Sequence, residues 1–118
     1  MRKYLDMTQA DLTRCESIIM NIIWSHNEPV STGQIIKELK EKYHRDYART
    51  TVVTFGERME KKGFIKRHRS GRIGYMSAVM DKNTYLKSYF QDAVDFWLDG
   101  DVSRLAMYVG KEDRGENS

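Results

Sequence analysis

Hydroxyl and guanidinium side chains gather in one short segment, residues 49–58, where helical spacing places most of them on one outer side. Threonine hydroxyls can bond base edges or phosphates, threonine methyls can contact the thymine methyl, and arginine can pair with guanine. An apolar side chain beside them adds contact with methyl groups. The residues that offer this chemistry are Arg49, Thr50, Thr51, Val53, Thr54 and Arg58. The segment therefore has the composition of a surface that reads nucleic acid.

Positive charge continues beyond this segment. Between Arg45 and Arg72 there are nine Lys and Arg residues against three acidic ones, although the whole chain has a net charge of only +3. Residues 1–80 carry a net +6 and residues 81–118 a net −3. Such a basic segment is a candidate surface for a polyanion. The side chains that we expect to clamp phosphates, and so to position the protein without reading sequence, are Lys66, Arg67, Arg69 and Arg72.

Other kinds of chemistry have little support in the sequence. Cys15 is the only cysteine, so an internal disulfide and a cysteine-based zinc site are both impossible. No paired catalytic carboxylates, nucleophile motif or phosphate-binding glycine loop is present in the sequence. His26, His44 and His68 are scattered, and we expect plain surface or loop positions for them. We therefore expect no enzyme, no metal and no cofactor.

The location expected from the sequence is the cytoplasm, without membrane insertion. No apolar run approaches the ~20 residues that span a bilayer. The first residues contain no apolar stretch typical of a signal peptide.

Two helices are predicted ahead of the reading segment. Thr13 and Glu16 form a capping box that starts the first, and Pro29 cannot continue it. Ser31 and Gln34 form a second box, after which apolar residues repeat with helical period. The expected solvated face of this second helix consists of Lys37, Glu38, Lys40, Glu41 and Lys42.

The reading segment itself is predicted to be a helix over residues 48–62 that stops at Gly63. Asp46 is the expected cap, and Tyr47 is expected on the outer face. Gly56 falls on the inner face, where a mid-helix glycine costs about 1 kcal/mol relative to alanine. Either a neighbour packs tightly there, or this helix is less stable than usual.

After this helix the period changes to that of strands. Residues 64–69 and 73–79 form a predicted β-hairpin, and Ser70–Arg72 supplies its turn glycine. Three helices followed by a basic hairpin is the layout of a winged helix-turn-helix, with the third helix as reader. We therefore expect a mainly α fold with a small β-hairpin wing, in which residues 1–80 form a winged helix-turn-helix DNA-binding domain.

The C-terminal part is predicted to contain a helix over residues 82–98, a short helical segment over 102–109, and a disordered tail over 111–118. The helices carry more apolar surface than one small domain can cover, so residues 81–110 are the expected dimerisation region. The alternative is that they fold back on their own winged helix. The candidate dimer contacts are Leu86, Tyr89, Phe90, Ala93, Phe96, Trp97 and Leu105.

Four segments give the sequence a family resemblance: residues 12–16, 20–24, 51–54 and 58–65. With their spacing to the wing, they resemble the penicillinase repressor family (BlaI/MecI/CopY type) over about residues 12–109. The resemblance implies a homodimeric repressor that binds double-stranded DNA at an inverted-repeat operator through the positions of Thr50, Thr51, Val53 and Thr54.

The resemblance also implies an induction route. A membrane metalloprotease sensor, or a protease downstream of it, would relieve repression by cleavage in the dimerisation region. The corresponding bond here joins Asp101 and Val102, where other members carry Asn-Phe. The residues alone leave one alternative function, a winged-helix module that binds protein and not DNA.

Overall fold

The computed structural model describes residues 11–110. This range divides into two compact units, one that ends at Lys82 and one that starts at Asn83. Between residues 11 and 110, no helix combines the length and the apolar character that crossing a bilayer requires. The predicted disordered tail, 111–118, lies outside the described residues.

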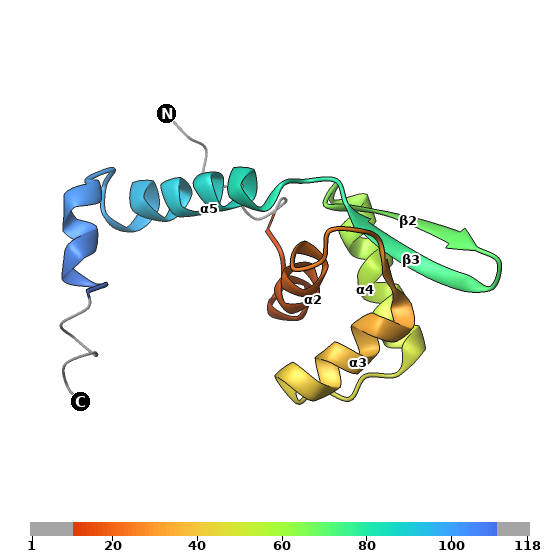
Figure 1. Cartoon of the computed structure of the whole chain (residues 1–118). Coiled ribbons are helices and arrows are strands. Elements are labelled where there is room, and N and C mark those ends of the chain that lie inside the picture. The colour runs from red at the N-terminus through yellow and green to blue at the C-terminus, as the bar shows by residue number, and fades with distance from the viewer. Residues whose placement is uncertain (1–10, 111–118) are drawn as a thin grey trace. The chain divides into compact units, whose positions relative to one another are not determined.

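The first unit contains the helices α2 (Arg14–Trp24), α3 (Thr32–Tyr43) and α4 (Arg49–Lys61), which pack together at the base of a projecting hairpin (Figure 1). The apolar periodicity correctly predicted all three. Their inner faces meet in one core whose side chains are at most 3% exposed. The core side chains of this unit are Ile19, Met20, Ile22, Ile23, Val30, Ile35, Leu39, Val52, Met59, Phe64, Ile65 and Met76.

The first capping box is confirmed. The Thr13 hydroxyl accepts from the Glu16 N–H at 3.2 Å, and the Glu16 carboxylate accepts from the Thr13 N–H at 2.8 Å. The second box is only half formed. Ser31 caps α3 by accepting from the Gln34 N–H at 3.0 Å, but the Gln34 side chain donates instead to Glu38 at 2.7 Å.

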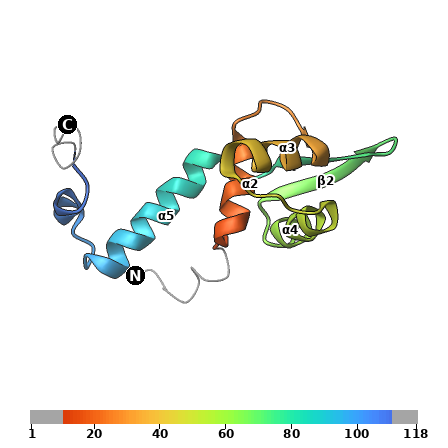
Figure 2. The same cartoon turned by 90° about the horizontal axis from the view of Figure 1, so that it is seen from below.

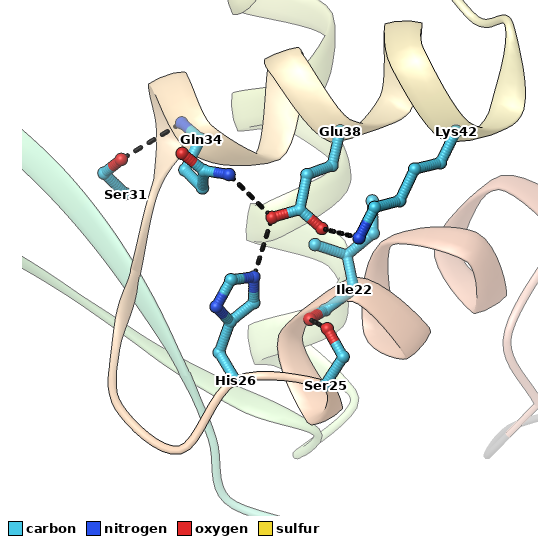
Figure 3. A network of polar contacts seen from close by, with 7 residues as sticks. All are labelled: Ile22, Ser25, His26, Ser31, Gln34, Glu38 and Lys42. Carbon is cyan, nitrogen blue, oxygen red and sulfur yellow. Dashed lines mark hydrogen bonds and ion pairs between the residues drawn. The ribbon is translucent and has the colours of Figure 1, made fainter.

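Glu38 does not lie on a solvated face, so that prediction is wrong. It is 4% exposed, and its carboxylate accepts from Gln34 and His26, each at 2.7 Å, and from Lys42 at 3.1 Å (Figure 3). Burial alone would raise the pKa of Glu38, but the hydrogen bonds from these three side chains lower it to about 2. His26 lies in a loop, as expected, but it is half-buried and its ring bonds Glu38, so it ties the loop after α2 to α3.

The start of α4 differs from the prediction. Its N-cap is Ala48, which makes no side-chain capping bond, so Asp46 is not the cap. Tyr47 is half-buried and does not lie on the outer face. Its hydroxyl is 3.0 Å from the Cys15 sulfur and accepts from Arg45 at 3.1 Å. The segment before α4 is therefore held by contacts to α2 rather than by a local cap.

The predicted wing is present as β2 (Ile65–Ser70) and β3 (Ile73–Ala78), paired antiparallel with Ser70 opposite Ile73. Gly71 has a φ of 65°, which the two-residue turn requires and which favours glycine. A third strand, β1 (Val30–Ser31), pairs with β3 and completes a sheet of order β1-β3-β2. Figure 2 shows the hairpin tip extending beyond α3 and α4.

The second unit contains most of α5 (Lys82–Trp97) and the 3-10 helix η1 (Val102–Met107). Asp99 and Gly100 turn the chain between them with φ values of 53° and 82°. Asp101 caps η1 by accepting from the Ser103 N–H at 3.1 Å. These two helices form the C-terminal helical region expected over residues 81–110.

Candidate nucleic-acid interface

The outer face of α4 presents four of the six predicted reading residues to solvent. Arg49, Thr50, Thr54 and Arg58 are exposed, whereas Thr51 and Val53 are half-buried on the flanks of the helix. The Thr54 hydroxyl donates to the Thr50 carbonyl at 3.0 Å. In this arrangement Thr54 offers a ligand its methyl group and the acceptor side of its hydroxyl.

The wing adds positive charge beside this face. Lys66, Arg69 and Arg72 are all exposed, and Arg69 donates to the Arg72 carbonyl at 3.3 Å, which braces the tip of the hairpin. His68 stacks on Tyr75 across the two strands, with ring centroids 5.5 Å apart and planes 14° apart. The tip is thus an ordered, basic projection.

An open cleft of about 670 Å³ connects the wing to α4. Arg49 and Val53 line it from the helix, and Arg69 and Arg72 line it from the hairpin. The fold therefore brings together predicted reading residues and wing residues that are about twenty positions apart in the sequence.

Sequence reasoning missed the contribution of α3 to this cleft. Ser31, Thr32 and Gly33, at the start of α3, also line it. A helix N-terminus carries free N–H groups and a partial positive charge, which suits a phosphate. The signal was available, because the Ser31 cap marks where this helix begins.

One predicted phosphate clamp is already engaged within the protein. Arg67 donates its Nε to Glu60 at 3.1 Å and its backbone N–H to the same carboxylate at 2.9 Å. These bonds lower the pKa of Glu60. The structure thus separates Arg67 from Lys66, Arg69 and Arg72, and it places Glu60, an acidic residue in a basic segment, beside a cation.

Gly56 faces a tightly packed neighbour, which resolves the alternatives left open by the sequence. A β-carbon built at Gly56 would lie 2.5 Å from the methyl carbon of Met76 and 3.3 Å from Cδ of Arg67. Both residues belong to the wing hairpin. The absence of a side chain at Gly56 therefore lets the wing approach the backbone of α4.

The second unit exposes a large apolar surface. Tyr89, Phe90, Phe96 and Trp97 are between 48% and 73% exposed, whereas Leu86, Ala93 and Leu105 are half-buried. An apolar groove of about 380 Å³ runs among side chains of α5 and η1. Exposed patches of this kind mark contact sites in soluble proteins. The groove is lined by Phe90, Ala93, Val94, Trp97, Leu98, Leu105 and Tyr108.

Within residues 11–110, no three His, Cys, Asp or Glu side chains are grouped so that they could hold a metal ion. The candidate interface in the first unit consists of a polar helix face and a basic hairpin, and the apolar surface belongs to the second unit.

Comparisons with known proteins agree with this arrangement. The family profile described as "Penicillinase repressor" matches residues 12–114. The penicillinase repressor of Bacillus licheniformis is 23% identical over 114 residues, which cover 97% of this chain and 83% of that protein. The methicillin resistance regulatory protein MecI of Mammaliicoccus sciuri is 29% identical over 114 residues, covering 96% and 90%. The solution structure of the DNA binding domain of the repressor BlaI superposes with a TM-score of 0.54 at 27% identity, covering 72% of this chain and 94% of that domain.

Proposed function

The chain belongs to the penicillinase repressor family, and from this premise we propose that it is a DNA-binding transcriptional repressor that acts as a homodimer on an inverted-repeat operator. The observation that carries the proposal is the exposed polar face of α4, joined by one open cleft to a basic wing. A major groove admits one α-helix. With α4 in the groove, the wing is left to contact neighbouring phosphates.

The residues divide into two roles. Thr50, Val53 and Thr54 contact base edges, where hydroxyls and methyls discriminate between base pairs. Lys66, Arg69 and Arg72 contact phosphates and set the position of α4. Arg49, Thr51 and Arg58 lie at the margins of the groove and serve either role.

Selection from a pool of random duplexes tests this function. The recovered sequences should contain an inverted repeat with half-sites about 10 base pairs, or a multiple of that, apart. Affinity for the selected duplex should fall as salt rises, because phosphate contacts release counterions. Failure to enrich any sequence, or binding that is insensitive to salt, would favour a winged-helix module that binds protein.

Removing one wing charge should weaken binding without changing its selectivity. Arg72→Gln is expected to lower affinity for selected and unselected duplexes by the same factor, because a phosphate contact carries no sequence information. The slope of log affinity against log salt should become shallower by about 1.8, because each bound dimer loses two phosphate contacts at about 0.9 each. Fluorescence anisotropy titrations at several salt concentrations measure both quantities.

Lys87→Gln is the control, because it removes the same charge from an exposed position on α5. It should leave the slope unchanged. A change in selectivity caused by Arg72→Gln would contradict the assignment of Arg72 to a phosphate.

The homodimer is proposed from the exposed surface of the second unit. Trp97 is 73% exposed and Phe90 is 55% exposed, and both line the apolar groove. A second copy would bury this surface, and a two-fold protein matches an inverted repeat. The proposed contacts are Leu86, Tyr89, Phe90, Ala93, Phe96, Trp97 and Leu105.

A charge placed in this surface should separate the two copies. Trp97→Glu is expected to raise the dissociation constant of the dimer by about 30-fold or more, because the substitution removes an aromatic hot spot from each copy. Sedimentation equilibrium measures this constant. Ser88→Glu is the control, since nine residues place Ser88 on the opposite side of α5. An unchanged dissociation constant for Trp97→Glu would show that the two copies contact each other through another surface or do not form a dimer.

Relief by proteolysis is the last part of the proposal. Asp101 and Val102 are both exposed, and Val102 is 66% exposed. Asp101 also caps η1, so cleavage of this bond requires the first turn of η1 to open. A membrane metalloprotease sensor, or a protease downstream of it, is the partner proposed for this step.

A further inference from the structure

Glu60 and Gly56 of α4 both contact the wing, and the strand that they contact, β2, lies at the edge of the sheet. Glu60 accepts two bonds from Arg67, one from its backbone N–H at 2.9 Å and one from its Nε at 3.1 Å. β2 is an edge strand of the sheet, and an edge strand has backbone groups that no further strand can pair. Glu60 therefore acts from α4 as a side-chain partner for this edge.

Gly56 supplies the second half of the arrangement. It lies four residues before Glu60, so both share one face of α4. The Arg67 stem and the Met76 thioether occupy the space that a side chain at Gly56 would fill. Gly56 and Glu60 thus contact the same arginine. The aliphatic stem of Arg67 packs against Gly56, and its guanidinium bonds Glu60.

We infer that Gly56 and Glu60 form a seat for Arg67 that fixes the distance between α4 and the wing, and that Glu60 is a positioning residue for DNA selectivity. This inference rests on the proposed function, because the spacing matters only if α4 and the wing contact the same duplex. With Arg67 seated, Lys66, Arg69 and Arg72 are the wing cations left for phosphates.

Glu57 provides a comparison within the same helix. It is exposed, and no ion pair or hydrogen bond of its side chain occurs among residues 11–110. Replacing Glu57 or Glu60 with alanine removes the same charge from α4, but only the Glu60 substitution disrupts the seat. Comparing Glu57→Ala with Glu60→Ala therefore separates the effect of losing a negative charge on α4 from the effect of losing the contact with Arg67.

Amide hydrogen exchange tests the seat without DNA. In Glu60→Ala, the Arg67 amide should exchange faster by on the order of tenfold, which matches the loss of one hydrogen bond to a charged acceptor. Glu57→Ala should leave this rate unchanged. An unchanged Arg67 rate in Glu60→Ala would overturn the inference.

Binding tests the positioning role. The probes are the duplex that the wild-type chain selects from a random pool and an unselected duplex of equal length. Glu60→Ala should reduce the preference for the selected duplex by on the order of tenfold, the effect of one mismatched base pair. The two Arg67 side chains released in each dimer should also steepen the salt slope by about 1.8, which is about 0.9 for each. Glu57→Ala should preserve the preference.

An Arg67→Gln background completes the test. There, adding Glu60→Ala should not lower the preference further, because the seat is already empty. A faster Arg67 amide in Glu60→Ala together with an unchanged preference would overturn the positioning role. A wild-type chain that prefers no duplex would instead refute the proposed function, and with it the role in selectivity, while the exchange rates would still decide whether the seat exists.

Discussion

Replacing Lys62 with methionine is expected to lower the free energy of unfolding by about 3 kcal/mol, the cost of leaving a buried charge without its partner. Lys62 donates to the Glu16 carboxylate at 2.6 Å and to the Asp11 carbonyl at 2.8 Å. Glu16 is fully buried, and its other oxygen has no hydrogen-bond partner within residues 11–110. Methionine keeps the length and apolar stem of the side chain, so the change removes mainly the charge.

The electrostatics of Glu16 support this size of effect. Burial alone would raise the pKa of Glu16, but the hydrogen bond from Lys62 and the bonds from Thr13 outweigh it and lower the pKa. Without Lys62, desolvation would dominate. The same bond joins the start of α2 to the C-cap of α4, so its loss also loosens the C-terminal end of α4.

Urea unfolding at one fixed protein concentration measures the effect, because the proposed dimerisation would make stability depend on concentration. Lys61→Met is the matched control, since Lys61 is exposed one residue away, and it should change stability by less than about 0.5 kcal/mol. In a Glu16→Gln background, Lys62→Met should cost much less, because no buried charge remains. A full loss of about 3 kcal/mol in that background would show that packing, not charge, explains the effect.

Features that depend on neighbours along the chain could be predicted from the sequence. The Thr13–Glu16 box joins residues three apart, and the helical period placed Thr50, Thr54 and Arg58 on an exposed face. The hairpin followed from Gly71, whose conformation is needed at a tight turn. Each of these depends on local backbone geometry, which a short stretch of sequence specifies. That the exposed face binds DNA stays a prediction.

Features that depend on distant partners could not be predicted. Tyr47 fits an outer helix face by its spacing, but its actual neighbour Cys15 lies 32 positions away. The two-residue strand β1 exists only because β3 lies beside it. The contacts of Gly56 and Glu60 with Arg67 form only when the wing packs against α4, so these two positions cannot be interpreted from the sequence alone. In each case the partner is determined by the three-dimensional fold, and the periodicity of the sequence carries no information about it.

Acid should remove a large part of the stability of the chain through Glu38. A carboxyl group whose pKa is lower in the folded than in the unfolded state stabilises the fold fully above its unfolded pKa and loses this effect as the pH falls through the folded value. The pKa of Glu38 falls from an ordinary value of 4.5 to about 2 in the fold. Since each pKa unit corresponds to about 1.4 kcal/mol, ionised Glu38 contributes about 3 kcal/mol at neutral pH.

Glu38→Gln is therefore expected to be less stable than the wild type by up to about 3 kcal/mol at pH 7. This difference should shrink as the pH falls below 4.5 and close as it approaches 2, because protonated Glu38 and glutamine are both neutral. Urea unfolding at a series of pH values measures the two curves. Glu41→Gln, at an exposed position of the same helix, should follow the wild type throughout.

A constant gap between wild type and Glu38→Gln at every pH would contradict this account, since it would assign the loss to shape rather than charge. Converging curves would instead show that the network of His26, Gln34 and Lys42 stabilises the fold by holding an ionised carboxylate (Figure 3). Because His26 follows α2 and the other residues belong to α3, this network joins α2 to α3, and α3 in turn packs against α4. The loss of this network in acid should therefore loosen the packing of α2 and α3, the helices that hold α4, before the apolar core unfolds.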